Sequence, residues 1–281
     1  MRRTVMLREH HETPDPLWAI NDKLGGYEFA ARLGVDHPEV LGSYTSTREI
    51  DFAALPDRFV LKTRILSTNR GVKALVRLSG GAYHDLLRDR VWSVSELHAD
   101  HARLEATKAG PLPLMVEELL TKPERPNDVV DDWKLYCFDG VVGLIMQRDL
   151  MGSPEQMDWR FKYWDTEFVD LGAIKDVERH DSSLEAPRFP DQLIEVAERL
   201  SRGMGRPFVR IDLLESGRGP LLGEFTPHPG RPQVFLPEYD SQLGRLWEQA
   251  EARIVARDIT AGRWSHLSGG RQDQLVDLRS R

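Results

Sequence analysis

The sequence predicts an α+β fold, in which β-hairpins are combined with a small number of helices. Asp139-Gly140, a dipeptide typical of tight hairpin turns, joins two stretches of alternating apolar and polar residues. The same strand–turn–strand pattern occurs three times, over residues 58–78, 131–148 and 208–226. Apolar residues recur at helical spacing over residues 24–33, 81–108, 190–202 and 239–260.

The first part of the chain predicts a helix followed by strands. Residues 1–20 are polar and contain two prolines, which indicates a loosely held lead-in. Lys23 stands at the start of the first predicted helix. It is either a contact for a phosphate or substrate or a solvated charge, and we favour the solvated charge. Residues 40–44 form a short strand. The first hairpin then encloses a polar loop, residues 63–71, that can fold over a phosphate chain.

The spacing of apolar residues in the middle of the chain predicts one long helix and then a strand. Residues 81–108 carry histidines at positions 84, 98 and 101, and no helical metal motif accompanies them, so we expect surface histidines. Residues 112–120 read as a strand, and residues 121–128, which contain two prolines, as a linker. Residues 150–190 predict short strands and a substrate-side loop. Residues 190–202 and 239–260 are the last two predicted helices.

Composition narrows the class of protein. A chain of 281 residues holds one large domain or two modest ones, and its formal net charge of -7 argues against general binding to nucleic acid or an anionic membrane. Cys137 is the only cysteine, which excludes an intramolecular disulfide and a cysteine-based zinc site. No apolar run reaches membrane-spanning length. We therefore expect a cytoplasmic protein without nucleic-acid or membrane partners.

The third hairpin carries the densest group of candidate site residues. Side chains two positions apart share a face of a strand, so Arg210 lies with Asp212, and Glu224 lies with Thr226. If both pairs point to one side, hard oxygen ligands converge beside a fixed cation, which suits Mg²⁺ that carries a phosphate chain. A surface hairpin with solvated charges has the same spacing, and the spacing alone does not decide between the two.

The order of several short motifs resembles the ATP-grasp superfamily, most closely the branch named for teichuronopeptide biosynthesis (TupA-like). The resemblance covers roughly residues 20–255 and rests on these stretches in order: residues 59–62, a polar loop, and residues 116–119, 132–140, 210–212 and 223–227. It implies two α/β subdomains with mainly antiparallel sheets that grip ATP between them. It further implies a ligase that joins a carboxylate to an amine through an acyl phosphate.

The resemblance also implies a domain division. Residues 1–55 would be a reduced N-terminal region and residues 56–120 the small, lid-like subdomain. Residues 121–265 would be the large catalytic subdomain, followed by a polar tail over residues 266–281.

The site residues follow from the resemblance by position. Lys62 and Lys134 would neutralise the α- and β-phosphates of ATP. The strand that ends at residue 120 would be the hinge beside adenine, whose edge the backbone of Glu117 and Leu119, with Glu118 between them, would contact. The predicted Mg²⁺ ligands are Asp212, Glu224 and Thr226. Thr226 stands where many ATP-grasp enzymes carry asparagine.

Three arginines complete the predicted site. Arg210 would stabilise the phosphoryl group during transfer, together with Lys134. Arg231 or Arg148 would pair with the carboxylate of the acid or with the acyl phosphate. The expected substrates are a small-molecule or peptide acid and an amine, in the biosynthesis of a natural product or a cell-surface polymer.

Two other functions stay open at this point. A kinase that phosphorylates a hydroxyl group would share the same phosphate-binding residues. A non-catalytic nucleotide-binding protein is the second alternative, because Thr226 is a weak metal ligand and the polar loop contains a single glycine, Gly71.

Overall fold

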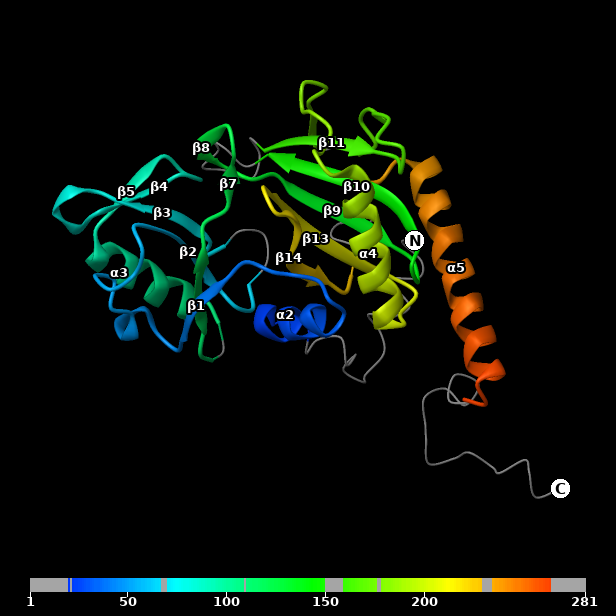
Figure 1. Ribbon diagram of the computed structural model, residues 1–281, viewed down its shortest axis with the longest axis horizontal. Helices are drawn as coiled ribbons and strands as arrows, with labels where there is room; N and C mark the ends of the chain where they lie inside the picture. Colours follow the sequence, from blue (N-terminus) through cyan, green and yellow to red (C-terminus); the bar gives the residue numbers. More distant parts are fainter. Residues whose placement is uncertain are drawn as a thin grey trace, which may run out of the picture.

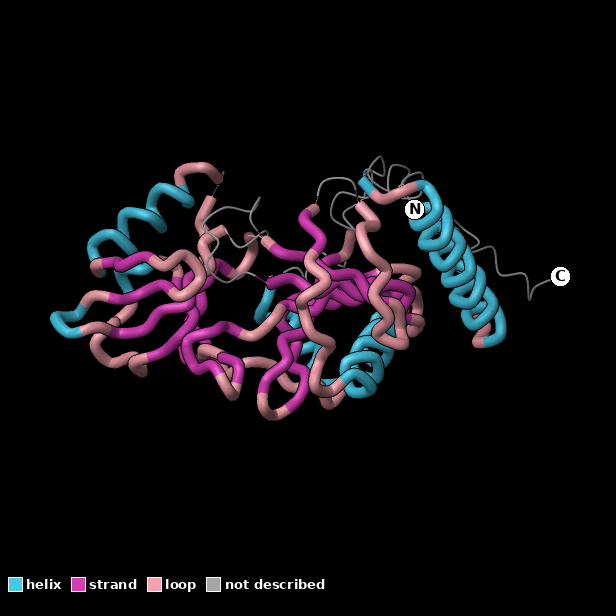
Figure 2. Tube along the Cα trace, turned by 90° about the horizontal axis from the view of Figure 1, so that it is seen from above, coloured by secondary structure: helices cyan, strands magenta, loops and turns pink. Residues whose placement is uncertain are grey.

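The computed structural model describes residues 20, 22–66, 70–108, 110–149, 159–175, 178–228 and 234–263. These residues form two six-stranded sheets and one two-stranded sheet. The two large sheets lie side by side along the long axis of the molecule, with helix α3 at one end and helix α5 at the other (Figures 1 and 2). The predicted polar lead-in and polar tail lie outside the described residues.

The first sheet is antiparallel throughout and has the strand order β1-β6-β2-β3-β4-β5. Its strands are β1 (Val40–Tyr44), β2 (Arg58–Thr63), β3 (Lys73–Arg77), β4 (Tyr83–Asp85), β5 (Arg90–Trp92) and β6 (Leu114–Glu118). Strand β1 belongs to this sheet although it precedes the subdomain boundary predicted at residue 56. Helix α3 (Val94–Glu105) packs on one face, where Leu97 joins a core with Phe59 and Leu75.

The prediction of one helix over residues 81–108 is wrong. Strands β4 and β5 form a hairpin there, and the helix begins only at Val94, after a capping box between Ser93 and Glu96. Two features explain the difference. Gly80 and Gly81 have positive φ angles that interrupt the chain before β4, and Leu86 and Leu87 are buried in the turn of the hairpin. Apolar residues in a buried turn therefore imitate helical spacing.

Two further expectations for this region need correction. His101 is buried, and its Nε2 lies 2.9 Å from the carbonyl oxygen of Leu112, so it is not a surface histidine. The predicted linker over residues 121–128 contains a small hairpin made of β7 (Thr121–Lys122) and β8 (Arg125–Val129).

The second sheet has the strand order β12-β11-β10-β9-β13-β14, and only β11 and β12 run parallel. Its strands are β9 (Asp132–Cys137), β10 (Val142–Asp149), β11 (Arg160–Trp164), β12 (Arg179–His180), β13 (Val209–Ser216) and β14 (Gly219–Thr226). The structure confirms the hairpins predicted over residues 131–148 and 208–226. Because β9 pairs with β13, these two hairpins form the centre of one sheet.

One face of the second sheet is covered by helices α2 (Lys23–Arg32) and α4 (Pro190–Met204), and α4 crosses the sheet in Figure 1. Leu193 and Leu200 of α4 pack there against Leu135 and Ile211. The opposite face has two parts. Helix α5 (Pro237–Thr260) covers its apolar end, where Trp247 stacks on Phe208. The other end carries the charged residues of β9, β13 and β14 and faces the first sheet.

Replacement of Trp247 by alanine tests how α5 is attached. The Trp247 side chain is fully buried, and its ring lies 5.1 Å from that of Phe208, centroid to centroid. We expect Trp247→Ala to lower the free energy of unfolding by about 3–5 kcal/mol, measured by urea denaturation. Glu248→Ala, on the exposed side of the same helix, should change it by no more than about 0.5 kcal/mol. Equal stability of the two variants would contradict this packing.

Candidate active site

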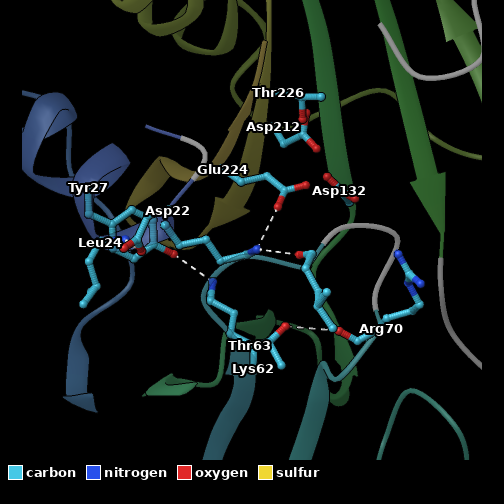
Figure 3. Close-up of polar contacts among 12 residues, drawn as sticks. Asp22, Leu24, Tyr27, Lys62, Thr63, Arg70, Asp132, Asp212, Glu224 and Thr226 are labelled. Atoms are coloured by element: carbon cyan, nitrogen blue, oxygen red, sulfur yellow. Dashed lines mark hydrogen bonds and ion pairs between the residues drawn. The ribbon is translucent and has the colours of Figure 1, made fainter. Parts of the chain in front are cut away.

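A cleft between the two large sheets collects most of the predicted site residues. Figure 3 shows Asp132, Asp212, Glu224 and Thr226 on the second sheet, opposite Lys62 and Thr63 of the first sheet. The charged side chains that line the cleft come from both sheets and from α2, and they are Lys23, Lys62, Glu117, Asp132, Lys134, Arg148, Asp212 and Glu224.

On the first sheet, the cleft is bounded by a buried hydrogen-bonded group. The alternation of β2 places Val60 and Lys62 toward the cleft. The Nζ of Lys62 lies 2.6 Å from Glu117 Oε1 and donates to the hydroxyl oxygen of Tyr27 at 2.9 Å, and Tyr27 in turn donates to Glu117 at 2.9 Å. Burial lowers the pKa of Lys62, and the Glu117 carboxylate partly opposes this effect. The ion pair with Glu117 therefore offsets part of the cost of burying the Lys62 ammonium.

On the second sheet, three neighbouring strands place a lysine and two carboxylates in one row. Lys134 of β9 lies opposite Asp212 of β13, and Asp212 lies opposite Glu224 of β14. The Nζ of Lys134 contacts Asp212, and it lies 2.8 Å from Asp132 Oδ2. Burial is the main cause that lowers the pKa of Lys134, and Arg148 adds to it. The register of this sheet therefore brings the predicted phosphate and metal residues together.

Arg210 joins the two predicted pairs of the third hairpin. Its guanidinium donates to both carboxylate oxygens of Asp212, at 2.6 and 2.8 Å, and to the hydroxyl of Thr226 at 2.7 Å. It also lies 3.8 Å from Glu224. The predicted convergence is thus confirmed, and the interpretation as a solvated surface hairpin is wrong. The hydroxyl of Thr226 accepts a hydrogen bond from Arg210, and its role as a metal ligand stays a prediction.

Lys23 lines the cleft, although a solvated charge was the favoured prediction for it and a phosphate or substrate contact the alternative. It is buried, and its Nζ lies 3.2 Å from Glu224 Oε2 and donates to the carbonyl oxygen of Leu66 at 3.0 Å. Asp22, the N-cap of α2, pairs with Arg64 and so holds this helix end against the loop after β2. The contacts of Lys23 are made only in the tertiary structure, and no local pattern in the sequence indicates them.

Asp132 lines the cleft without a role predicted from the sequence. It pairs with Lys134 and with Arg148, and the guanidinium of Arg148 lies 4.4 Å from the ring centroid of Trp159. A signal for Asp132 was available in the sequence, because it stands two positions before Lys134 and therefore on the same face of β9. Arg148, predicted to hold a substrate carboxylate, lines the cleft beside this pair.

The predicted hinge residues occupy three different environments. Glu117 turns its carboxylate to Lys62 inside the cleft. The N–H of Glu118 donates to the carbonyl oxygen of Glu39, and its carboxylate pairs with Arg218. The structure therefore does not bring the Glu118 side chain into the cleft. Leu119 follows the last residue of β6 and packs against the cluster that contains Ala74 and Leu87. Arg231 lies outside the described residues.

One end of the cleft is apolar. The side chains that line it there are Val60, Val72, Ala74, Leu87 and Val129. Leu119 packs against the same cluster, so the predicted hinge borders this end of the cleft. An apolar slot next to backbone groups suits a flat heteroaromatic ring.

The charges in the cleft nearly balance. Five cations, from the three lysines named above and from Arg148 and Arg210, meet four carboxylates, from Glu117, Asp132, Asp212 and Glu224. Among the residues that the structure describes, no three His, Cys, Asp or Glu side chains form a metal-binding group. Each cleft carboxylate has a cation as its partner.

The donor chemistry nevertheless fits Mg²⁺. Asp212 and Glu224 lie directly opposite each other on paired strands and offer hard carboxylate oxygens. Mg²⁺ commonly binds one or two protein carboxylates and completes its octahedron with water and phosphate oxygens. These two residues would hold the ion, which would have to displace Lys23 from Glu224, and Lys134 and Arg210 from Asp212.

Comparison with known proteins identifies the family of the chain. Residues 3–248 match the family described as TupA-like ATPgrasp. The chain belongs to this family. The match confirms the predicted resemblance and the α+β ATP-grasp fold. No curated protein matches the chain.

Solved structures resemble the TupA-like chain at low sequence identity, and those with a TM-score above 0.5 share its fold. The D-alanine–D-alanine ligase from Bacillus anthracis is 14% identical, with a TM-score of 0.51 over 85% of this chain and 70% of that one. A structure of a Bacillus anthracis D-alanine–D-alanine ligase complexed with ATP is 13% identical, with a TM-score of 0.51 over 85% and 68%. D-cycloserine synthetase DcsG is 17% identical, with a TM-score of 0.48 over 89% and 80%. Within the described ranges of the TupA-like chain, no helix is both long and apolar enough to cross a membrane.

The ion pairs of Glu224 predict a pH-dependent stability. Burial alone would raise the pKa of Glu224, but Lys23, Lys134 and Arg210 outweigh it and lower the pKa from 4.5 to about 2. A lowered pKa contributes stability above pH 4.5 that is lost as the pH falls through 2. We expect Glu224→Gln to lower the free energy of unfolding by on the order of 3 kcal/mol at pH 7, and by about half of that at pH 3.

Urea denaturation at several pH values measures this difference. Glu248→Gln, an exposed carboxylate on α5, is the matched control and should differ from the parent protein by no more than about 0.5 kcal/mol. A Glu224→Gln protein that is as stable as this control at pH 7 would refute the charge balance described for the cleft.

Proposed function

We propose that this protein is an ATP- and Mg²⁺-dependent carboxylate–amine ligase that forms an amide or peptide bond through an acyl phosphate. The pathway we propose is the biosynthesis of a natural product or a cell-surface polymer. One observation supports the proposal most strongly. Lysines from two different sheets, Lys62 and Lys134, face the opposed carboxylates Asp212 and Glu224 in a single cleft. That arrangement can neutralise a phosphate chain and hold its metal ion together.

ATP would lie across the cleft. Its adenine would occupy the apolar end, beside the backbone of Glu117 and Leu119, and its phosphates would contact Lys62 and Lys134. Lys23 would contact the phosphates as well, because its Nζ lies in the same cleft, 3.2 Å from Glu224 Oε2. Mg²⁺ at Asp212 and Glu224 would reduce the negative charge of the transferred phosphoryl group.

The proposed reaction has two bond-forming steps. An oxygen of the substrate carboxylate attacks the γ-phosphorus of ATP, the bond to ADP breaks, and an acyl phosphate forms. The amine nitrogen then attacks the acyl carbon, phosphate leaves, and the amine loses a proton as the amide forms. Arg210, which lies 3.8 Å from Glu224, would stabilise the phosphoryl group, and Arg148, or Arg231, would pair with the carboxylate of the acid.

The names of solved structures with the same fold support the proposal of a ligase. The Bacillus anthracis protein of the same fold is named D-alanine–D-alanine ligase, and its complex contains ATP. By analogy of fold, we propose that this chain also acts on a small-molecule or peptide acid and an amine.

Product analysis distinguishes this function from its alternatives. A ligase should release ADP and phosphate from Mg²⁺ and ATP only when both an acid and an amine are present, and mass spectrometry should detect an amide. A phosphoester product would instead indicate a kinase. Nucleotide binding without turnover, for every acid and amine supplied, would indicate a non-catalytic protein.

We expect Glu224→Gln to reduce the rate of ADP formation roughly a hundredfold or more, because the metal ion and the transferred phosphoryl group lose a shared anionic ligand. The assay should be run at a temperature at which circular dichroism shows the variant to be folded. Glu248→Gln should retain the parent rate. Turnover of Glu224→Gln at the rate of this control would exclude Glu224 as a metal ligand.

A further inference from the structure

A second carboxylate-binding arrangement lies on the same sheet face as the cleft. The hydroxyl of Tyr163, on β11, donates to Oε2 of Glu178, and the Nζ of Lys175 lies 3.0 Å from Oε1 of the same residue. Two donors from different segments therefore converge on one carboxylate, with one donor for each oxygen. Such charge-assisted hydrogen bonds are stronger than those between neutral groups, and a ligand carboxylate could accept the same two.

The two donors are held more firmly than the carboxylate that they bind. Tyr163 is 2% exposed, and its hydroxyl also contacts the sulfur of Met146 at 3.0 Å. The Lys175 ammonium lies 5.4 Å from the ring centroid of Tyr163 and 4.7 Å from that of Phe235. The side chain of Lys175 is 3% exposed, and that of Glu178 is 17% exposed. Glu178 is therefore the member of the group that can turn toward solvent and leave.

The position of Tyr163 relates this group to the proposed chemistry. Tyr163 lies opposite Met146, Met146 opposite Lys134, and Lys134 opposite Asp212, so all four share one row of the second sheet. Strands are about 5 Å apart, which places Tyr163 roughly 10 Å from Lys134 along this row. Burial and Glu178 raise the pKa of Tyr163 well above its usual value, so its hydroxyl remains a hydrogen-bond donor at neutral pH.

We propose that Tyr163 and Lys175 form a subsite for a second carboxylate of the substrate acid, and that Glu178 occupies this subsite when the substrate is absent. The inference rests on the proposed ligase function and narrows its substrate class to acids with two carboxylates. The reacting carboxylate would lie near Arg210 and the metal ligands, and the second would replace Glu178. An acid with one carboxylate leaves Glu178 in place and gains none of these contacts.

Calorimetric titration of the full chain with simple acids tests the subsite. The probes are the unbranched dicarboxylates from glutarate to azelate, and the reference ligands are the monocarboxylates of equal chain length. We expect at least one dicarboxylate to bind about tenfold or more tightly than its monocarboxylate, which corresponds to a net gain of about 1.4 kcal/mol after Glu178 has been displaced. The absence of any such preference in the parent protein would overturn the inference.

Variants separate a binding role from a merely structural one. Lys175→Met should remove the preference for dicarboxylates and leave monocarboxylate binding unchanged, whereas Glu178→Gln should strengthen dicarboxylate binding, because the internal competitor loses its charge. Lys108→Met, at an exposed position, is the matched control. If the ion pair is only structural, Lys175→Met and Glu178→Gln lower the thermal midpoint and change neither affinity, which would also overturn the inference. Should Lys175→Met fail to fold, Tyr163→Phe and Glu178→Gln decide the question.

Failure of this inference is distinguishable from failure of the ligase proposal. The titrations use no nucleotide, and the ligase proposal is judged by ADP and amide formation. A dicarboxylate preference that Lys175→Met removes, in a protein that never forms ADP, would support the subsite and reject the ligase. Amide formation without that preference would support the ligase and reject the subsite.

Discussion

The structure depends on the mutual compensation of charges that are buried between the two large sheets. A buried ion without a partner is costly, and removal of one member of a buried pair typically destabilises a protein by several kcal/mol. Here Lys62 and Glu117 of the first sheet pair with each other and bind Tyr27 of α2, and Lys23 of the same helix pairs with Glu224 of the second sheet. The same contacts therefore connect the two sheets and set the electrostatics of the cleft.

This compensation also constrains what can bind. With five cations and four carboxylates, the cleft has a small positive excess. A lone divalent cation would increase that excess, whereas ATP that arrives with Mg²⁺ brings a net negative charge. Metal and nucleotide should therefore enter together, with the lysines transferred from carboxylates to phosphates. This exchange of partners explains how Mg²⁺ could bind although the described residues contain no cluster of three metal ligands.

Alternation along strands made the second sheet predictable from the sequence. The two-residue period fixed which side chains of β13 and β14 share a face, and the Asp-Gly turn fixed the hairpin beside them. Tertiary contacts were not predictable in the same way. The side chains of Lys23 and Tyr27 reach the site from α2, and no local pattern in the sequence indicates that they lie there. In residues 81–108, leucines buried in a hairpin turn imitated a helix, because periodicity does not distinguish a buried turn from a helical face.

The most direct test of the account is a crystal structure of the full chain with ADP and Mn²⁺ in place of Mg²⁺, read by anomalous scattering. Manganese should lie between the carboxylates of Asp212 and Glu224, with the phosphates in contact with Lys62 and Lys134. The ammonium of Lys23 should have left Glu224. Manganese bound elsewhere, or a phosphate chain outside this cleft with the Lys23–Glu224 pair intact, would contradict the account.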